Sequence, residues 1–202
     1  MLELAGEASI SRFVYTSTTA VMTSSSSLPD LRRARWLTED SVPSPTDLYG
    51  TSKLAAEQLC REWHAQTGMN MIILRPSRFF HRDLLEHSVQ FTQANHRANE
   101  FLYRRAAVED VAMAHVLALE NADQLKRELF FVSSPTPFQN SDCEELISNA
   151  PSVVQRYYPQ YRRVYEERAW QMYPSIDRVY VSHKIQSCLG MKFCETFAEQ
   201  ID

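Results

Sequence analysis

The 202-residue sequence predicts an α/β protein built on a parallel β-sheet. Three short apolar runs, at residues 12–18, 69–76 and 127–134, are typical of buried strands. Two stretches with helical periodicity, at residues 48–68 and 109–121, separate these runs. Because strands and helices alternate at these spacings, each helix would connect two strands that run in the same direction.

The first half of the chain begins with the end of a helix at residues 1–9, followed by a strand that ends in hydroxyl residues. A polar loop is predicted at residues 23–36. We interpret its serine run as a flexible surface segment, with a phosphate-contacting loop as the alternative. Turn and capping residues then lead into a helix from Leu48 to Gly68, where the glycine is suited to end the helix.

The second half has a less regular pattern. Periodicity is weak over residues 77–100, whereas residues 101–108 favour a strand. The next helix carries Glu109 and Asp110 at its start, where the helix dipole favours negative charge. From Pro135 onward the pattern predicts short helices rich in tyrosine and arginine.

Composition narrows the classes of function. The formal net charge is −4 and the basic residues are spread along the chain, which argues against nucleic-acid binding. No apolar run approaches the ~20 residues that cross a bilayer, and the N-terminus lacks the pattern of a signal peptide, so we expect a cytoplasmic protein.

The four cysteines form no CxxC pair, and we expect reduced thiols. Potential ligands are dense at residues 81–87, but we expect a solvated polar loop there and no metal site.

Tyr49 and Lys53 are separated by four residues at the start of a predicted helix, so both would lie on one face. A positive charge beside a phenol favours the phenolate, and such a pair can exchange a proton with a substrate hydroxyl. A second pair with the same spacing, Tyr180 and Lys184, occurs near the C-terminus. The spacing alone therefore does not identify the catalytic pair.

Five segments in order identify the chain as similar to a known family. They are "RFVYTSTTAVM", "YGTSKLAAE", "IILRPSRFF", "RRAAVEDVAMAHVLALE" and "DRVYVSHKIQSCLGMKF". Together they resemble the extended short-chain dehydrogenase/reductases, the NAD-dependent epimerase/dehydratase family that includes UDP-glucose 4-epimerase. The resemblance covers most of the chain and implies the C-terminal part of a Rossmann-like parallel sheet plus a small mixed substrate domain. Residues 1–80 and 104–134 would belong to the NAD(P)-binding part, and residues 81–103 and 135–202 to the substrate-binding part.

The resemblance also implies roles for individual residues. Tyr49 would be the general acid or base, and Lys53 would support it and hold the nicotinamide ribose. Thr18 would form a hydrogen bond with the reacting oxygen, and Thr16 would offer a hydroxyl on the cofactor side. The turn at Pro76–Ser77 would pass beside the nicotinamide.

The implied substrate is a nucleotide sugar, oxidised by hydride transfer to NAD or NADP while Tyr49 removes a proton. For Arg78 we expect a contact with a phosphate or carboxylate of the substrate, with a surface salt bridge as the alternative, and for Arg104 a contact with a diphosphate. Arg78 replaces the asparagine common in sugar epimerases, and Phe80 and His81 replace the usual Tyr-Gly, which leaves the sugar open.

Tyr180 and Lys184 fall in the C-terminal segment, where we expect a structural surface pair. Family members often dimerise through the helix that carries the tyrosine and lysine, so a homodimer is possible. Leu59 and Trp63 lie on this helix, and for both we expect ordinary core packing.

The family's glycine-rich GxxGxxG turn has no counterpart here, because the four glycines are far apart in the sequence. We therefore expect about a hundred N-terminal residues to be missing relative to the family, and NAD binding only when they are supplied. Two alternatives remain open. One is an NADP-dependent carbonyl reductase of the same family, and the other is a non-catalytic remnant that acts only as a binding protein.

Overall fold

The computed structural model describes residues 1–22, 31–80 and 91–202. The predictions for the serine run at residues 24–27 and for the polar loop at residues 81–87 lie outside the described residues. The main sheet has three strands in the order β1-β3-β6, and both pairs are parallel. Its strands are β1 (Arg12–Thr16), β3 (Asn70–Pro76) and β6 (Arg127–Val132). The predicted parallel α/β sheet is thus confirmed.

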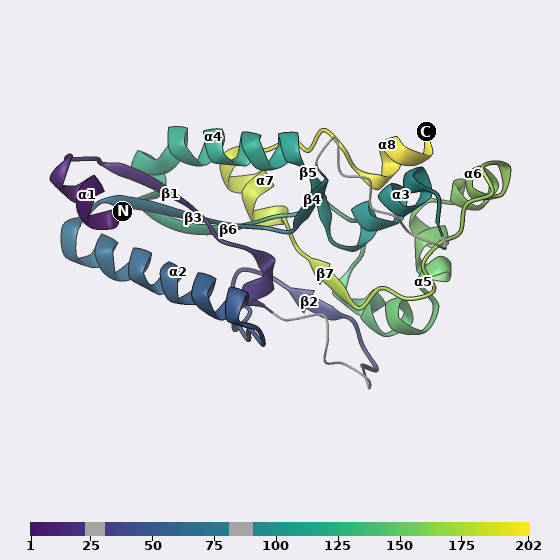
Figure 1. The fold of residues 1–202 in the computed structure, drawn as a ribbon. Helices are drawn as coiled ribbons and strands as arrows, with labels where there is room; N and C mark the ends of the chain where they lie inside the picture. Colours follow the sequence, from purple (N-terminus) through teal and green to yellow (C-terminus); the bar gives the residue numbers. More distant parts are fainter. Residues whose placement is uncertain (23–30, 81–90) are drawn as a thin grey trace.

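Helices cover both faces of this sheet. Helix α2 (Leu48–Thr67) lies on one face, while α4 (Val108–Leu125) and α7 (His183–Leu189) lie on the other (Figure 1). Short helix α1 (Leu2–Glu7) contacts α2. Every residue of the central strand β3 is buried, as expected for a strand between two helical layers. The two long helices therefore form as the sequence predicted.

The ends of α2 show why it starts and stops where it does. The Asp47 side chain accepts a hydrogen bond from the Gly50 N–H at 2.6 Å and caps the first turn. Gly68 follows the last turn with a φ of 75°, a left-handed conformation that glycine adopts without steric cost.

Two small sheets correct the sequence interpretation. β2 (Arg35–Leu37) pairs with β7 (Arg178–Tyr180), although residues 35 and 36 were predicted as loop. β4 (Arg78–Phe80) pairs with β5 (Arg105–Ala107), although residues 101–103 of the predicted strand end a helix instead. Each of these strands has three residues, too few to show a period of two, and each forms only because its partner is brought alongside.

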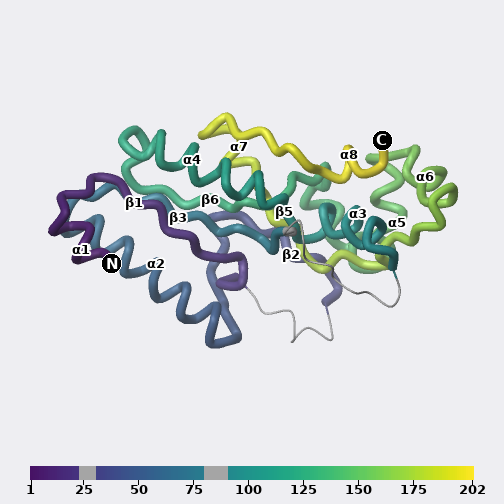
Figure 2. Tube along the Cα trace, turned by 45° about the horizontal axis from the view of Figure 1, so that its top comes forward, coloured from purple at the N-terminus to yellow at the C-terminus, as the bar shows by residue number. Residues whose placement is uncertain are grey.

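The remaining helices form a second group at the far end of the molecule from the N-terminus (Figure 2). They are α3 (Gln93–Tyr103), α5 (Cys143–Tyr157), α6 (Tyr161–Glu167) and α8 (Phe197–Ile201). The 3₁₀ turn η2 (Asn140–Asp142) leads directly into α5, whereas the 3₁₀ turn η1 (Thr19–Val21) follows β1. Phe101, Leu146 and Phe197 belong to a hydrophobic cluster that these helices share. Separate clusters fill the two sides of the sheet.

Helix α2 also presents an apolar surface. Leu59 is 62% exposed, which contradicts its predicted core packing, whereas Trp63 packs against a buried cluster as expected.

All four cysteines are free. Among residues 1–22, 31–80 and 91–202, no helix is long and apolar enough to cross a membrane.

Candidate active-site cleft

A cleft with a volume of about 640 Å³ opens beside the carboxyl ends of β1 and β3. This edge of a parallel sheet is where α/β proteins place their ligands. All eight residues that the sequence assigned to the site line the cleft: Thr16, Thr18, Tyr49, Lys53, Pro76, Ser77, Arg78 and Arg104. The fold thus gathers residues that are up to 88 positions apart, from 16 to 104, into one cavity.

Gly50 allows α2 to approach the turn that follows β1. A Cβ atom at this position would lie 2.7 Å from the Ala20 carbonyl oxygen and 3.0 Å from the Pro45 Cβ. Only a residue without a side chain fits there without moving the backbone. This close packing places Tyr49, the preceding residue, on the same cleft wall as Thr18.

Lys53 is held at the cleft by its ammonium group, which donates a hydrogen bond to the Thr16 carbonyl oxygen at 2.9 Å. Its Nζ lies 6.0 Å from the centre of the Tyr49 ring and 5.2 Å from the centre of the Tyr15 ring. Tyr15 does not line the cleft, and burial raises the pKa of its phenol. Tyr49 lines the cleft and is 55% exposed, so of these two phenols it is the one that a substrate can reach.

Thr18 has a hydroxyl with a defined orientation. Its Oγ1 accepts a hydrogen bond from the Ala20 N–H at 3.1 Å and so caps the short η1 turn. Because the oxygen acts as acceptor in this contact, its own proton stays available to donate. The geometry suits a donor to an oxygen atom of a bound substrate.

The hydroxyl of Thr16 faces His115 of α4, with 2.6 Å between Oγ1 and Nε2. The other ring nitrogen, Nδ1, lies 2.7 Å from the Val111 carbonyl oxygen, which can only accept a hydrogen bond. Nδ1 must therefore carry a proton, and in a neutral imidazole Nε2 accepts the proton of Thr16. Thr16 then offers only lone pairs to a ligand in the cleft.

A buried ion pair stabilises the segment that carries Thr16 and Thr18. Glu57 of α2 accepts two hydrogen bonds from Arg75 of β3, at 2.8 Å from Nε and 2.7 Å from a terminal nitrogen. Ser17, between the two site threonines, donates to the same carboxylate at 2.6 Å. All three residues are buried. The pair thus fixes the backbone that carries Thr16 and Thr18.

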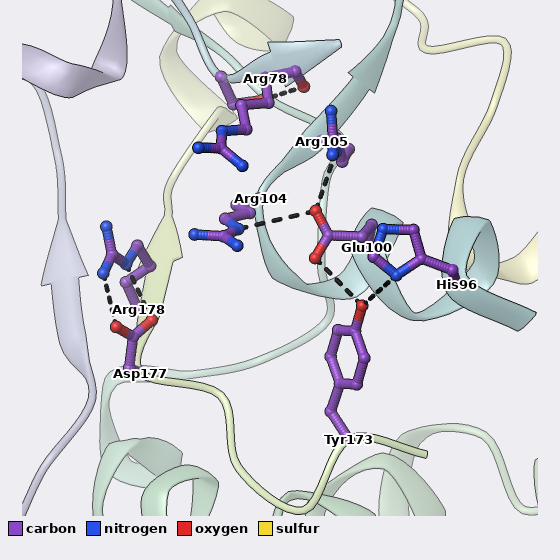
Figure 3. A network of polar contacts seen from close by, with 9 residues as sticks. Arg78, His96, Glu100, Arg104, Arg105, Tyr173, Asp177 and Arg178 are labelled. Carbon is purple, nitrogen blue, oxygen red and sulfur yellow. Dashed lines mark hydrogen bonds and ion pairs between the residues drawn. The ribbon is translucent and has the colours of Figure 1, made fainter. Parts of the chain in front are cut away.

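Arginines line one side of the cleft (Figure 3). Arg105 and Arg178 line the cleft together with Arg78 and Arg104, and the sequence interpretation missed them. Arg178 donates to Asp177 at 2.8 and 2.5 Å. Burial on its own raises the pKa of Asp177, but the hydrogen bonds from Arg178 and Tyr103 outweigh it and lower this pKa below its ordinary value.

Tyr180 is corrected from a surface residue to a buried one that lines the cleft. Its ring packs edge-on against Phe131, with 5.7 Å between centroids. Lys184 forms an ion pair with Glu128 instead. Tyr180 and Lys184 have the same spacing as Tyr49 and Lys53, but no sequence pattern indicated that Tyr180 lines the cleft.

Lys53, Pro76 and Ser77, which the sequence analysis assigned to the nicotinamide end of a cofactor, all line the cleft. They do not form the glycine-rich turn that holds a pyrophosphate. Gly68 and Gly190 end helices, Gly6 packs near Trp63, and Gly50 packs on η1. Among the residues that the structure describes, no group of three or more metal-ligating side chains is found.

Comparison with known sequences gives a family. The model of the NAD dependent epimerase/dehydratase family matches residues 1–132. A curated relative, the uncharacterized protein y4nG of Sinorhizobium fredii (strain NBRC 101917 / NGR234), is 39% identical over 67 residues. That alignment covers 33% of this chain and 15% of the relative.

Comparison with solved structures supports the fold. The UDP-N-acetylglucosamine 4-epimerase from Bacillus cereus has a TM-score of 0.59 and 19% identity, covering 99% of this chain and 64% of that protein. The UDP-glucuronic acid 4-epimerase from Bacillus cereus, solved in complex with NAD, has a TM-score of 0.58 and 17% identity, covering 99% and 60%. The chain therefore spans less than two thirds of the length of either enzyme. At these identities the likeness shows the fold, which is Rossmann-like as predicted.

Proposed function

The chain belongs to the NAD dependent epimerase/dehydratase family, and we propose that its cleft serves proton transfer coupled to hydride transfer on a nucleotide sugar. The observation that carries the proposal is the joint placement of Thr18, Tyr49 and Lys53 in one cleft at the carboxyl ends of the strands. These are a phenol, an ammonium group and an oriented hydroxyl, the groups that a proton transfer needs. The structural relatives include enzymes whose names specify UDP-sugars.

In the proposed reaction Tyr49 takes the proton of a sugar hydroxyl, and Thr18 donates a hydrogen bond to the same oxygen. Lys53 places its ammonium charge 6.0 Å from the centre of the Tyr49 ring, beside the group that accepts the proton. NAD or NADP bound there would supply the hydride acceptor for the sugar carbon and, in an epimerase, the hydride donor for its reduction on the other face. Reversal of the proton transfer by Tyr49 then completes the cycle.

Arg78 and Arg104 are proposed to bind the negatively charged part of the substrate. Both line the cleft, and guanidinium groups match the geometry of phosphate oxygens. A diphosphate held there would leave the sugar free to extend toward Tyr49. In this assignment the sheet side of the cleft holds the nicotinamide and the arginine side holds the nucleotide sugar.

Cofactor binding is proposed to require a glycine-rich segment that these 202 residues do not contain. A pyrophosphate is normally bound by backbone N–H groups that glycines expose at a helix N-terminus. Without such a segment the chain would contact only the nicotinamide end. A homodimer through α2 also remains a proposal, with Leu48 and Leu59 as its exposed apolar residues.

The test joins the chain to the N-terminal NAD-binding segment of the Bacillus cereus UDP-N-acetylglucosamine 4-epimerase. Interconversion of UDP-sugars in the presence of NAD is then followed by chromatography. We expect turnover by the fusion, and a loss of about 10²-fold or more in Tyr49→Phe because the proton-transferring oxygen is gone. Tyr158→Phe, in the helical group away from the cleft, is the matched control and should keep the parental rate.

A Tyr49→Phe rate equal to that of the parent would refute the assignment of the base. A fusion that consumes NADPH with a carbonyl substrate, but converts no UDP-sugar, would favour the reductase alternative. A folded fusion without either activity would favour a protein that only binds.

A further inference from the structure

Glu100 is a buried carboxylate at the base of the arginine side of the cleft. It is 2% exposed and lies in the last turn of α3. Its Oε2 accepts a hydrogen bond from Arg105 Nε at 2.8 Å, and the same oxygen is 3.6 Å from Arg104 Nε (Figure 3). One carboxylate therefore contacts two successive arginines. Nothing in the sequence pattern singled it out.

Arg104 depends on this carboxylate for its orientation. Its Nε is buried and has no hydrogen-bond partner among the residues that the structure describes. The ion pair with Glu100 at 3.6 Å and the Tyr103 ring, 4.7 Å from its guanidinium carbon, hold it, and the Asp177 carboxylate also interacts with its charge. Figure 3 shows its terminal nitrogens directed away from Glu100, toward the side where Arg78 and Arg178 lie. The terminal nitrogens of Arg104 thus face the cleft, while its Nε is held by Glu100.

The arginines on this side of the cleft differ in whether they have a carboxylate counter-ion. Arg178 has Asp177 as its counter-ion, and Arg105 has Glu100. Arg78 has no ion pair among the described residues, and it lies next to Arg105 in the register of β4 and β5. Neighbouring like charges repel one another, and an anion bound between them offsets this repulsion. A fixed Arg104 and an unpaired Arg78 therefore favour an anionic ligand.

Residues 171–173 also hold Glu100 in place. The Tyr173 hydroxyl donates to Glu100 Oε1 at 3.2 Å and lies 2.8 Å from His96 Nδ1. The neighbouring Gln171 backbone is bound by two asparagine side chains of α3, at 2.8 to 2.9 Å. The carboxylate is thereby fixed by two elements that are far apart in the sequence.

We propose that Glu100 is a positioning residue that holds Arg104 beside Arg78, so that the two guanidinium groups bind one oxyanion of the substrate. The ligand chemistry is a phosphoryl or carboxylate group, since both offer paired oxygens to a guanidinium. This proposal rests on the proposed function only in assuming that an anionic substrate enters the cleft. It adds a residue that itself does not touch that substrate.

The experiment measures equilibrium binding by calorimetry, with the 202-residue chain and three probes: inorganic pyrophosphate, UDP and glucuronate. Glu100→Gln keeps the shape of the side chain and removes its charge. We expect about tenfold weaker binding of the preferred probe, the loss expected when one charge-assisted contact is misplaced. Glu195→Gln is the matched control, because its ion pair with Arg97 also involves α3 but lies outside the cleft lining. That control should leave the affinity unchanged.

A double-mutant cycle separates positioning from general damage to the fold. In an Arg104→Ala background, the effect of Glu100→Gln on affinity should fall to less than about twofold, the part that its other contact, Arg105, can transmit. If Glu100→Gln fails to fold, Tyr173→Phe replaces it, since this variant loosens Glu100 without removing its charge. We expect a loss of about threefold for Tyr173→Phe, which should also shrink in the Arg104→Ala background.

Preference for pyrophosphate and UDP would identify the phosphoryl source, and preference for glucuronate the carboxylate source. The proposal is overturned if the wild-type chain binds none of the three probes. It is also overturned if Glu100→Gln binds within twofold of wild type, or if its loss persists in the Arg104→Ala background. Failure of the fusion to convert UDP-sugars, with binding intact, would count against the proposed function and leave this proposal standing.

Discussion

Neutralising Glu57 should destabilise the chain severely, because its partner Arg75 cannot reach water. Both side chains are almost completely inaccessible, at 0% and 1% exposure, and they share two hydrogen bonds of 2.8 and 2.7 Å. Breaking a buried ion pair by removing one partner typically costs about 3–5 kcal/mol, since the remaining charge is left buried without compensation. A domain of ordinary stability has about 5–15 kcal/mol in total.

The measurement is urea unfolding of Glu57→Gln, followed by circular dichroism at neutral pH. Arg61 also contacts Glu57, at 3.3 Å, but it is 33% exposed and can turn toward solvent, so we assign the loss to Arg75. Glu62→Gln is the matched control on the same helix. Its carboxylate is exposed and accepts one hydrogen bond from Gln58, so the unfolding free energy should change by less than about 0.5 kcal/mol.

The double variant Glu57→Met with Arg75→Met sharpens the test. Replacing both charges by apolar side chains removes the unpaired charge, and such replacements are often neutral or stabilising. We therefore expect the double variant to be more stable than Glu57→Gln alone. A loss below about 1 kcal/mol in Glu57→Gln, or a double variant less stable than the single one, would show that the pair is not what holds this wall.

Three further predictions concern the cleft and its surroundings. In the active fusion, Thr18→Val should lose roughly 10²–10³ in rate while Thr18→Ser keeps most of it, and equal rates would mean that the hydroxyl is only structural. Asp177 has a folded-state pKa below its ordinary value of 3.8, so its contribution to stability is present above about pH 4 and is lost as the pH falls through the folded-state pKa. Urea unfolding of Asp177→Asn should accordingly depend less on pH below about pH 4 than that of wild type, and parallel curves would contradict this. The chain without an added glycine-rich segment should show no saturable NADH binding at micromolar concentrations, and tryptophan fluorescence that saturates there would refute the expected role of that segment.

Much of the fold could be predicted because the main strands and helices are marked by local sequence patterns. The strands β1, β3 and β6 are continuous apolar runs, since helices cover both faces of the sheet. Helix α2 has a capping aspartate before it and Gly68 after it, so its limits are local properties of the chain. The site residues nearest these elements, among them Thr18, Tyr49 and Lys53, could be placed because each follows or begins a predictable element.

The arginine side of the cleft required the tertiary structure. β2, β4, β5 and β7 are three-residue strands that form by pairing with distant partners, so no local periodicity indicates them. Arg105 and Arg178 lie on two of these strands. Glu100 is close to its ion-pair partners Arg104 and Arg105 along the chain, but Tyr173, which binds its second carboxylate oxygen, comes from a distant segment.

Exposure was likewise not a local property. Leu59 and Tyr180 are both apolar enough for either environment, and tertiary packing left the first in solvent and buried the second. The sequence by itself determined the order of the three main strands and the two long helices, and the residues that end α2, because these depend on neighbours along the chain. Which charges line the cleft together depends on segments more than a hundred residues apart, and only the assembled fold decides that.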